Sequence, residues 1–90
     1  MKSLRVIIHG KVQGVNFRFA TYEKALQFNL TGWVKNVAGR KVEALFEGEE
    51  EDLKEMLEFV KVGPQTARVT AVEEDYRDLP AQYSEFTIDY

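Results

Sequence analysis

The sequence contains no cysteine and a single histidine, His9. Without cysteine there is no disulfide framework and no thiol nucleophile, so the hydrophobic core alone must stabilise the fold. One histidine excludes a multi-histidine metal site, and the carboxylates do not have the spacing of a calcium-binding loop. We therefore expect a protein that binds no metal ion and needs no cofactor.

Long apolar runs are also missing. Residues 1–6 contain too short an apolar run for a signal peptide, and no run approaches the roughly 18 residues of a membrane-spanning helix. We expect a cytoplasmic protein that does not associate with membranes. A length of 90 residues, 44% of them apolar and 30% charged, predicts one small globular domain over residues 1–90.

Charge is distributed unevenly along the chain, whose net charge is −3. Residues 1–41 contain eight Lys or Arg and one acid, whereas residues 42–90 contain four Lys or Arg and fourteen acids. The basic half favours a small anionic ligand, and the acidic half argues against a long nucleic-acid track. The alternative is that the two halves interleave in space, so that their fields cancel.

The chain is organised around residues 10–19, which connect a predicted strand to a predicted helix. The first N–H groups of a helix lack partners and carry partial positive charge. Gly14 allows the backbone to approach a ligand closely, and Arg18 adds a guanidinium suited to a tetrahedral oxyanion. The stretch therefore predicts an anion site, in particular for a phosphoryl group. The alternative is a simple turn, since the spacing matches neither a Walker A loop nor a dinucleotide fingerprint.

Hydrophobic periodicity predicts an alternation of strands and helices. The predicted strands cover residues 4–9, 32–36, 41–48, 67–76 and 85–89, and the predicted helices cover residues 18–28 and a segment from the acidic run 48–52 to Gly63-Pro64. In strand 67–76, strict alternation places Val69 and Val72 on opposite faces. The order β-α-β-β-α-β, with an additional strand near the C-terminus, predicts an α+β, ferredoxin-like sandwich: an antiparallel sheet with two helices on one face.

Two polar residues, His9 and Asn36, lie near the ends of predicted strands and have simple structural explanations. Histidine is a common catalytic side chain, but on the open face of a sheet His9 is more simply a solvated side chain. Asn36 lies at the end of the predicted strand 32–36, where asparagine usually forms a turn.

Four stretches together resemble the acylphosphatase family. Residues 10–18, Gly-Lys-Val-Gln-Gly-Val-Asn-Phe-Arg, resemble its signature Gly-x-Val-Gln-Gly-Val-x-Phe-Arg. Residues 31–36, 42–43 and 63–69 match further family patterns in the same order, and the resemblance extends over essentially the whole chain. Departures occur at Asn29, Val37 and Gly39, which concern a helix end and a hairpin turn.

The resemblance implies hydrolysis of small acyl phosphates to a carboxylate and inorganic phosphate, which also acts as an inhibitor. It implies that Arg18 and Asn36 are catalytic, with Asn36 positioning the attacking water. The residues implied to bind phosphate through their backbone, joined by the Arg18 side chain, are Gln13, Gly14, Val15, Asn16, Phe17 and Arg18. The side chains of Gln13 and Asn16 are expected to matter less. A carboxylate is a good leaving group, so a site without metal, Cys or a His pair suffices for this reaction.

Two other functions are compatible with this fold. Open ferredoxin-like sheets bind RNA through aromatic residues, but residues 41–46 lack the expected aromatic string, so we expect no nucleic-acid partner. A sensor or regulatory domain would normally be fused to a partner domain. We expect a free-standing monomer.

Overall fold

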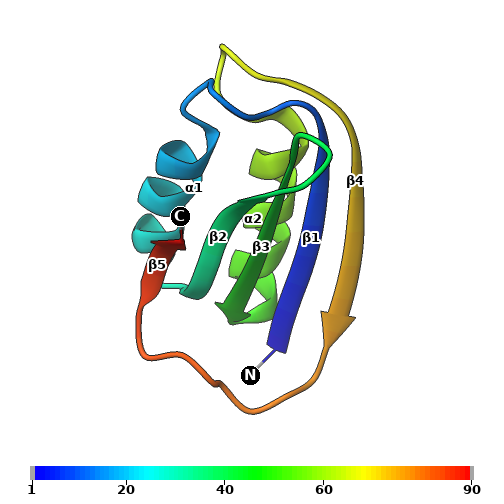
Figure 1. The fold of residues 1–90 in the computed structure, drawn as a ribbon. Coiled ribbons are helices and arrows are strands. Elements are labelled where there is room, and N and C mark those ends of the chain that lie inside the picture. Colours follow the sequence, from blue (N-terminus) through cyan, green and yellow to red (C-terminus); the bar gives the residue numbers. More distant parts are fainter. Residues whose placement is uncertain (1, 90) are drawn as a thin grey trace.

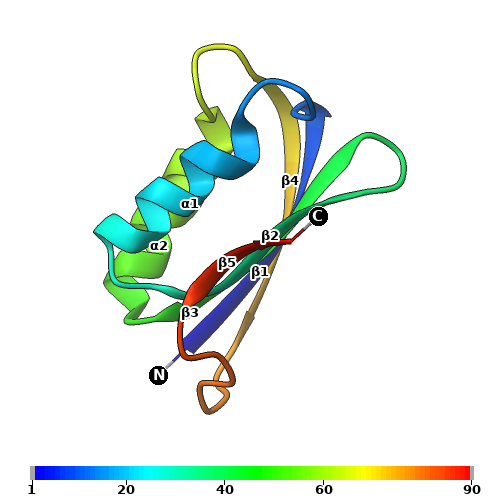
Figure 2. The ribbon, with the colours of Figure 1, turned by 60° about the vertical axis from the view of Figure 1, so that its left-hand side comes forward.

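A computed structural model of the chain describes residues 2–89 and has the predicted ferredoxin-like α+β fold. The elements are β1 (Lys2–Lys11), α1 (Phe17–Gln27), β2 (Thr31–Val37), β3 (Lys41–Gly48), α2 (Glu50–Val62), β4 (Arg68–Arg77) and β5 (Phe86–Asp89). Both helices cover the same face of one twisted sheet (Figures 1 and 2). Neither helix in residues 2–89 is long and apolar enough to cross a membrane.

The sheet has the strand order β4-β1-β3-β2-β5. β1 pairs antiparallel with β3 and β4, and β2 pairs antiparallel with β3. β5 instead runs parallel to β2, which makes the sheet mixed. The segment 78–85 runs along the lower end of the sheet in Figure 1, from the edge strand β4 to the opposite edge, where β5 pairs with β2.

The core lies between the helices and the sheet face that they cover. Alternate residues of β1 and β3 supply the sheet side: Leu4, Val6, Ile8, Val42, Ala44 and Phe46 are all buried. α2 supplies a stripe at helical spacing, Leu53, Met56, Leu57 and Val60, which is also buried. These two patterns confirm the periodicity predicted for strand 41–48 and for the second helix.

β4 departs from the predicted alternation. The register of β4 against β1 shifts between His9 and Gly10, so that Val69 lies opposite Gly10 and Ala71 opposite His9. This irregularity leaves Thr70 without a partner in the register, as in a β-bulge. Val69 and Val72 therefore both pack against the core, and the prediction that they lie on opposite faces is wrong.

The hairpin between β2 and β3 is a loop of residues 38–40, because Val37 lies directly opposite Lys41. Gly39 and the following Arg40 both have positive φ, 85° and 62°. The departure from the family pattern at this turn thus leaves a non-glycine residue in the left-handed region.

The basic and acidic halves of the chain interleave on the open sheet face. The guanidinium of Arg5 in β1 forms an ion pair with the buried carboxylate of Glu43 in β3, with Nε donating at 2.6 Å. His9 Nε2 lies 2.6 Å from a carboxylate oxygen of Glu73 in β4. His9 thus lies on the open face as predicted, but it is paired rather than only solvated.

Candidate active site

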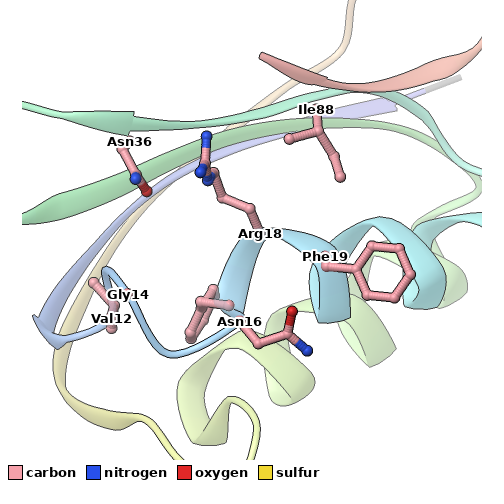
Figure 3. A pocket seen from close by; sticks show the side chains of 8 residues that line it. Val12, Gly14, Asn16, Arg18, Phe19, Asn36 and Ile88 are labelled. Atoms are coloured by element: carbon pink, nitrogen blue, oxygen red, sulfur yellow. The ribbon is translucent and has the colours of Figure 1, made fainter. Parts of the chain in front are cut away.

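A pocket of about 160 Å³ opens where the β1–α1 loop meets the end of β2. Its lining consists of Val12, Gly14, Asn16, Phe17, Arg18, Phe19, Asn36 and Ile88 (Figure 3). Asn36 shares its sheet face with Val34, which points toward the helices, and this places its amide beside the start of α1. The fold therefore brings Arg18 and Asn36, which are far apart in the sequence, into one pocket.

The loop backbone in this pocket has an unusual conformation. Gly14 has φ 73°, and Asn16, the N-cap of α1, is left-handed with φ 66° and ψ 21°. Within residues 2–89, the backbone N–H groups of Gly14, Val15 and Asn16 donate no hydrogen bond to another protein group. Left-handed residues in a turn allow neighbouring N–H groups to converge on an anion, so this backbone suits an anion nest.

The N-terminus of α1 is open to a ligand. Asn16 makes no side-chain cap, and the first turn of α1 contains no acidic residue. α2 differs, because Glu50, Glu51 and Asp52 occupy its first turn. The partial positive charge at the end of α1 is therefore left for an anion from outside the helix.

Arg18 is the one charged side chain among the residues that line the pocket. It is half-buried, and its Nη1 donates a hydrogen bond to the carbonyl oxygen of Asp89 at 3.1 Å. Its guanidinium lies between Asn36 and Ile88 (Figure 3). This arrangement makes the pocket electropositive and leaves the exposed Asn36 amide accessible from solvent.

Gln13 connects the loop to the β2–β3 hairpin. Its Nε2 donates to the carbonyl oxygens of Val37 at 2.9 Å and of Lys41 at 2.8 Å, one on each strand of the hairpin neck. Asn36 directly precedes Val37, so this clamp fixes the loop relative to Asn36. The sequence suggested only a backbone role for Gln13, and a local pattern has no signal for this contact.

The segment after α2 supports the loop from the other side. Thr66 Oγ1 donates to the carbonyl oxygen of Val15 at 2.6 Å. A Cβ added to Gly63 would lie 2.6 Å from Cε2 of Phe17, so the glycine permits close packing against this buried ring. The stretch 63–69 noted in the sequence thus acts on the loop, next to which it lies in Figure 1.

Four of the six residues predicted to bind phosphate line the pocket, and they are Gly14, Asn16, Phe17 and Arg18. Gln13 lines a neighbouring hollow instead, and the side chain of Val15 packs against the core. Phe19 and Ile88 also line the pocket and were not predicted. Ile88 lies there because β5 pairs with β2 in parallel, with Ile88 opposite Val34.

No group of three or more His, Asp or Glu side chains within residues 2–89 is placed to hold a metal ion. The donors at this pocket are instead N–H groups, a guanidinium and an amide. Such a set binds and orients an anion and, beside it, a water molecule.

Comparison with known proteins gives consistent results. A family model described as Acylphosphatase matches residues 4–88. An acylphosphatase from Geotalea uraniireducens is 41% identical over 85 residues, which cover 94% of this chain and 93% of that protein. The crystal structure of acylphosphatase from Bacillus subtilis is 37% identical, covers all of both chains and superposes with a TM-score of 0.96. An acylphosphatase structure from Coxiella burnetii is 36% identical with a TM-score of 0.90, covering 97% of this chain and 90% of that one.

Proposed function

Because the chain belongs to the acylphosphatase family and is thus a hydrolase, we propose that it cleaves the carboxyl–phosphate bond of acyl phosphates in the pocket around Arg18. The observation that carries this proposal is the convergence of Arg18, the loop backbone and Asn36 on one electropositive pocket. Inorganic phosphate leaves as a product and inhibits by occupying the same site.

The phosphoryl group binds to the loop. The guanidinium of Arg18 and the N–H groups of residues 13–18 donate to its non-bridging oxygens. Charge spreads over these oxygens in the transition state, so donors that are already in place stabilise it without reorganisation. The αL conformation of Asn16 and the clamp by Gln13 support this preorganisation.

Asn36 positions the attacking water. Its side-chain oxygen accepts a hydrogen bond from the water, whose oxygen then bonds to phosphorus as the phosphorus–acyl oxygen bond breaks. The electron pair of the broken bond stays on the departing carboxylate, and the proton of the water is lost to solvent. A carboxylate needs no proton from a general acid, because its pKa is about 4. The reaction therefore needs no metal ion.

The proposal is tested by measuring phosphate release from acetyl and benzoyl phosphate, with EDTA present. The wild-type protein is expected to hydrolyse both, and Arg18→Ala is expected to lower kcat by about 10³-fold or more, as loss of a main oxyanion donor does. Arg77→Ala is the matched control, because Arg77 is exposed at the far end of β4. Near wild-type turnover in Arg18→Ala would refute the role of this pocket.

We also propose that residues 1–90 act as one domain, as a monomer and in the cytoplasm. One buried cluster joins both helices to β1, β2, β3 and β5, with partly buried residues of β4 packed against it, and this supports the first of these proposals.

A further inference from the structure

We infer that Phe19 and Ile88 form an acyl-binding wall, which makes acyl phosphates with apolar and especially aromatic acyl groups the preferred substrates. This inference rests on the proposed function. It concerns the half of the substrate that the anion site does not hold.

The position of the wall follows from the direction of the reaction. Phe19 and Ile88 line the same pocket as Arg18 and Asn36. In Figure 3, Asn36 lies on one side of the Arg18 guanidinium, and Ile88 and Phe19 lie on the other. Attacking and leaving oxygens are roughly in line through phosphorus. A water held by Asn36 therefore directs the leaving acyl group toward Phe19 and Ile88.

The chemistry of the wall is apolar. Phe19 is 48% exposed as a residue, and Ile88 is half-buried beside the pocket. Single exposed apolar residues are common on protein surfaces, so exposure alone does not indicate a site. Apart from Arg18, no residue of the lining offers a charged partner for an acyl group. A charged acyl group would thus lose hydration there without a compensating contact.

The ring of Phe19 is held in place by a ladder of aromatic contacts. Phe19 stacks on Tyr22 with ring centroids 6.3 Å apart, and Tyr22 lies 6.3 Å from Phe86. Phe86 in turn stacks on the buried Phe46 at 5.6 Å with an interplanar angle of 6°. The ladder runs from the core to the rim of the pocket. An anchored ring loses little conformational freedom when it binds a flat acyl group, and this distinguishes Phe19 from a loose surface side chain.

β5 connects the wall to the anion site. Ile88 is fixed opposite Val34 in the parallel pair with β2, and the next residue, Asp89, accepts the hydrogen bond from Arg18. The same strand therefore carries the Ile88 side of the wall and holds the guanidinium. An acyl group that contacts the wall is placed in register with the phosphoryl oxygens at Arg18.

The test compares kcat/KM for benzoyl and acetyl phosphate in the wild type and in Phe19→Ala. The kcat/KM of each variant is divided by that of the wild type on the same substrate, so that the different intrinsic reactivities of the two compounds cancel. We expect Phe19→Ala to lower kcat/KM about tenfold for benzoyl phosphate, as loss of an aromatic contact does, and less than about twofold for acetyl phosphate. Phe19→Leu should restore a substantial part of the benzoyl activity.

Leu26→Ala is the matched control. Leu26 lies on the same helix and is 49% exposed, but it does not line the pocket. Leu26→Ala should leave kcat/KM unchanged for both substrates. An equal loss on both substrates in Phe19→Ala, or no loss on either, would overturn the acyl wall while leaving the hydrolase itself intact. Failure of the wild type to hydrolyse either compound would instead overturn the proposed function, and the wall with it.

Discussion

Asn36 is held at its place by the sheet and not by the turn that follows it. It is the last helix-facing position of β2, two residues after the buried Val34, and it lies opposite Val42 in β3. The side chain at that position cannot move to the other sheet face without breaking strand pairing. An amide there is both a donor and an acceptor, which suits it to orienting a water molecule.

Asn36→Ala should therefore separate catalysis from anion binding. We expect kcat to fall by about 10²-fold, as on loss of one positioned polar group, while the inhibition constant of inorganic phosphate stays within about threefold. Lys35→Ala is the control, since the preceding side chain lies on the opposite sheet face. Weak phosphate inhibition in Asn36→Ala would show that the amide binds the anion and would contradict the assigned role.

The sequence named candidate residues for the site but not the side chains around them. Arg18 and Asn36 were assigned by resemblance, and the structure brings both to one pocket, where their catalytic roles stay predictions. Phe19 and Ile88 were not assigned. Phe19 reaches the pocket from the first turn of α1, and Ile88 reaches it through the parallel pairing of β5 with β2, which was not predicted.

Among the elements, the clamp between the β1–α1 loop and the β2–β3 hairpin controls the geometry of the site. Both N–H groups of the Gln13 amide are used, one for each strand at the hairpin neck. The carbonyls of Val37 and Lys41 flank the loop of residues 38–40, and Asn36 directly precedes Val37. The amide thus couples the loop proposed to bind the phosphoryl group to the strand that carries Asn36, the residue proposed to position the water.

Gln13→Ala should loosen this coupling. Loss of two hydrogen bonds should lower the free energy of unfolding by about 1–3 kcal/mol in urea titrations. It should also lower kcat about tenfold, because small displacements of reacting groups are costly in rate. Gln27→Ala, at the exposed end of α1, is the control. Wild-type turnover in Gln13→Ala, with only the loss of stability, would leave the clamp a purely structural contact.

Elements with a strong local pattern were predicted correctly, and those that depend on a distant partner were not. β3 spans the predicted residues 41–48, and all four apolar residues of the α2 stripe are buried. The irregularity in β4 and the parallel pairing of β5 were not predicted. Both depend on register with strands far away in the sequence, which the alternation within a single strand does not encode.

At the scale of the whole molecule, one buried carboxylate fixes the path of the chain to β5. Glu47 is only 3% exposed, although alternation placed it on the open sheet face. Its oxygens accept hydrogen bonds from Thr31 Oγ1 at 2.7 Å and from the backbone N–H groups of Gln82 at 2.7 Å and Tyr83 at 3.1 Å. The segment 78–85 covers Glu47, and no property of residues 41–48 alone indicates this burial.

This network extends to the site through β5. Gln82 and Tyr83 lie shortly before β5. This strand carries Ile88 and Asp89, whose carbonyl oxygen accepts the hydrogen bond from Arg18. Trp33 Nε1 also donates to Tyr83 Oη at 3.1 Å, so β2 holds the same segment from a second point. We therefore expect the position of Ile88 in the acyl wall to depend on a carboxylate at the opposite end of the sheet.

Glu47→Gln tests that dependence. The amide keeps one acceptor oxygen but turns an NH₂ group toward backbone N–H donors, so about one charged hydrogen bond is lost and the free energy of unfolding should fall by about 2–3 kcal/mol. Glu55→Gln makes the same change at an exposed position of α2 and should shift stability by less than about 0.5 kcal/mol. At temperatures below the unfolding transition, where the variant is still folded, Glu47→Gln should lose more activity on benzoyl phosphate than on acetyl phosphate. The reason is that β5 supplies part of the acyl wall. Equal stability of the two variants would show that the segment 78–85 holds β5 in place without Glu47.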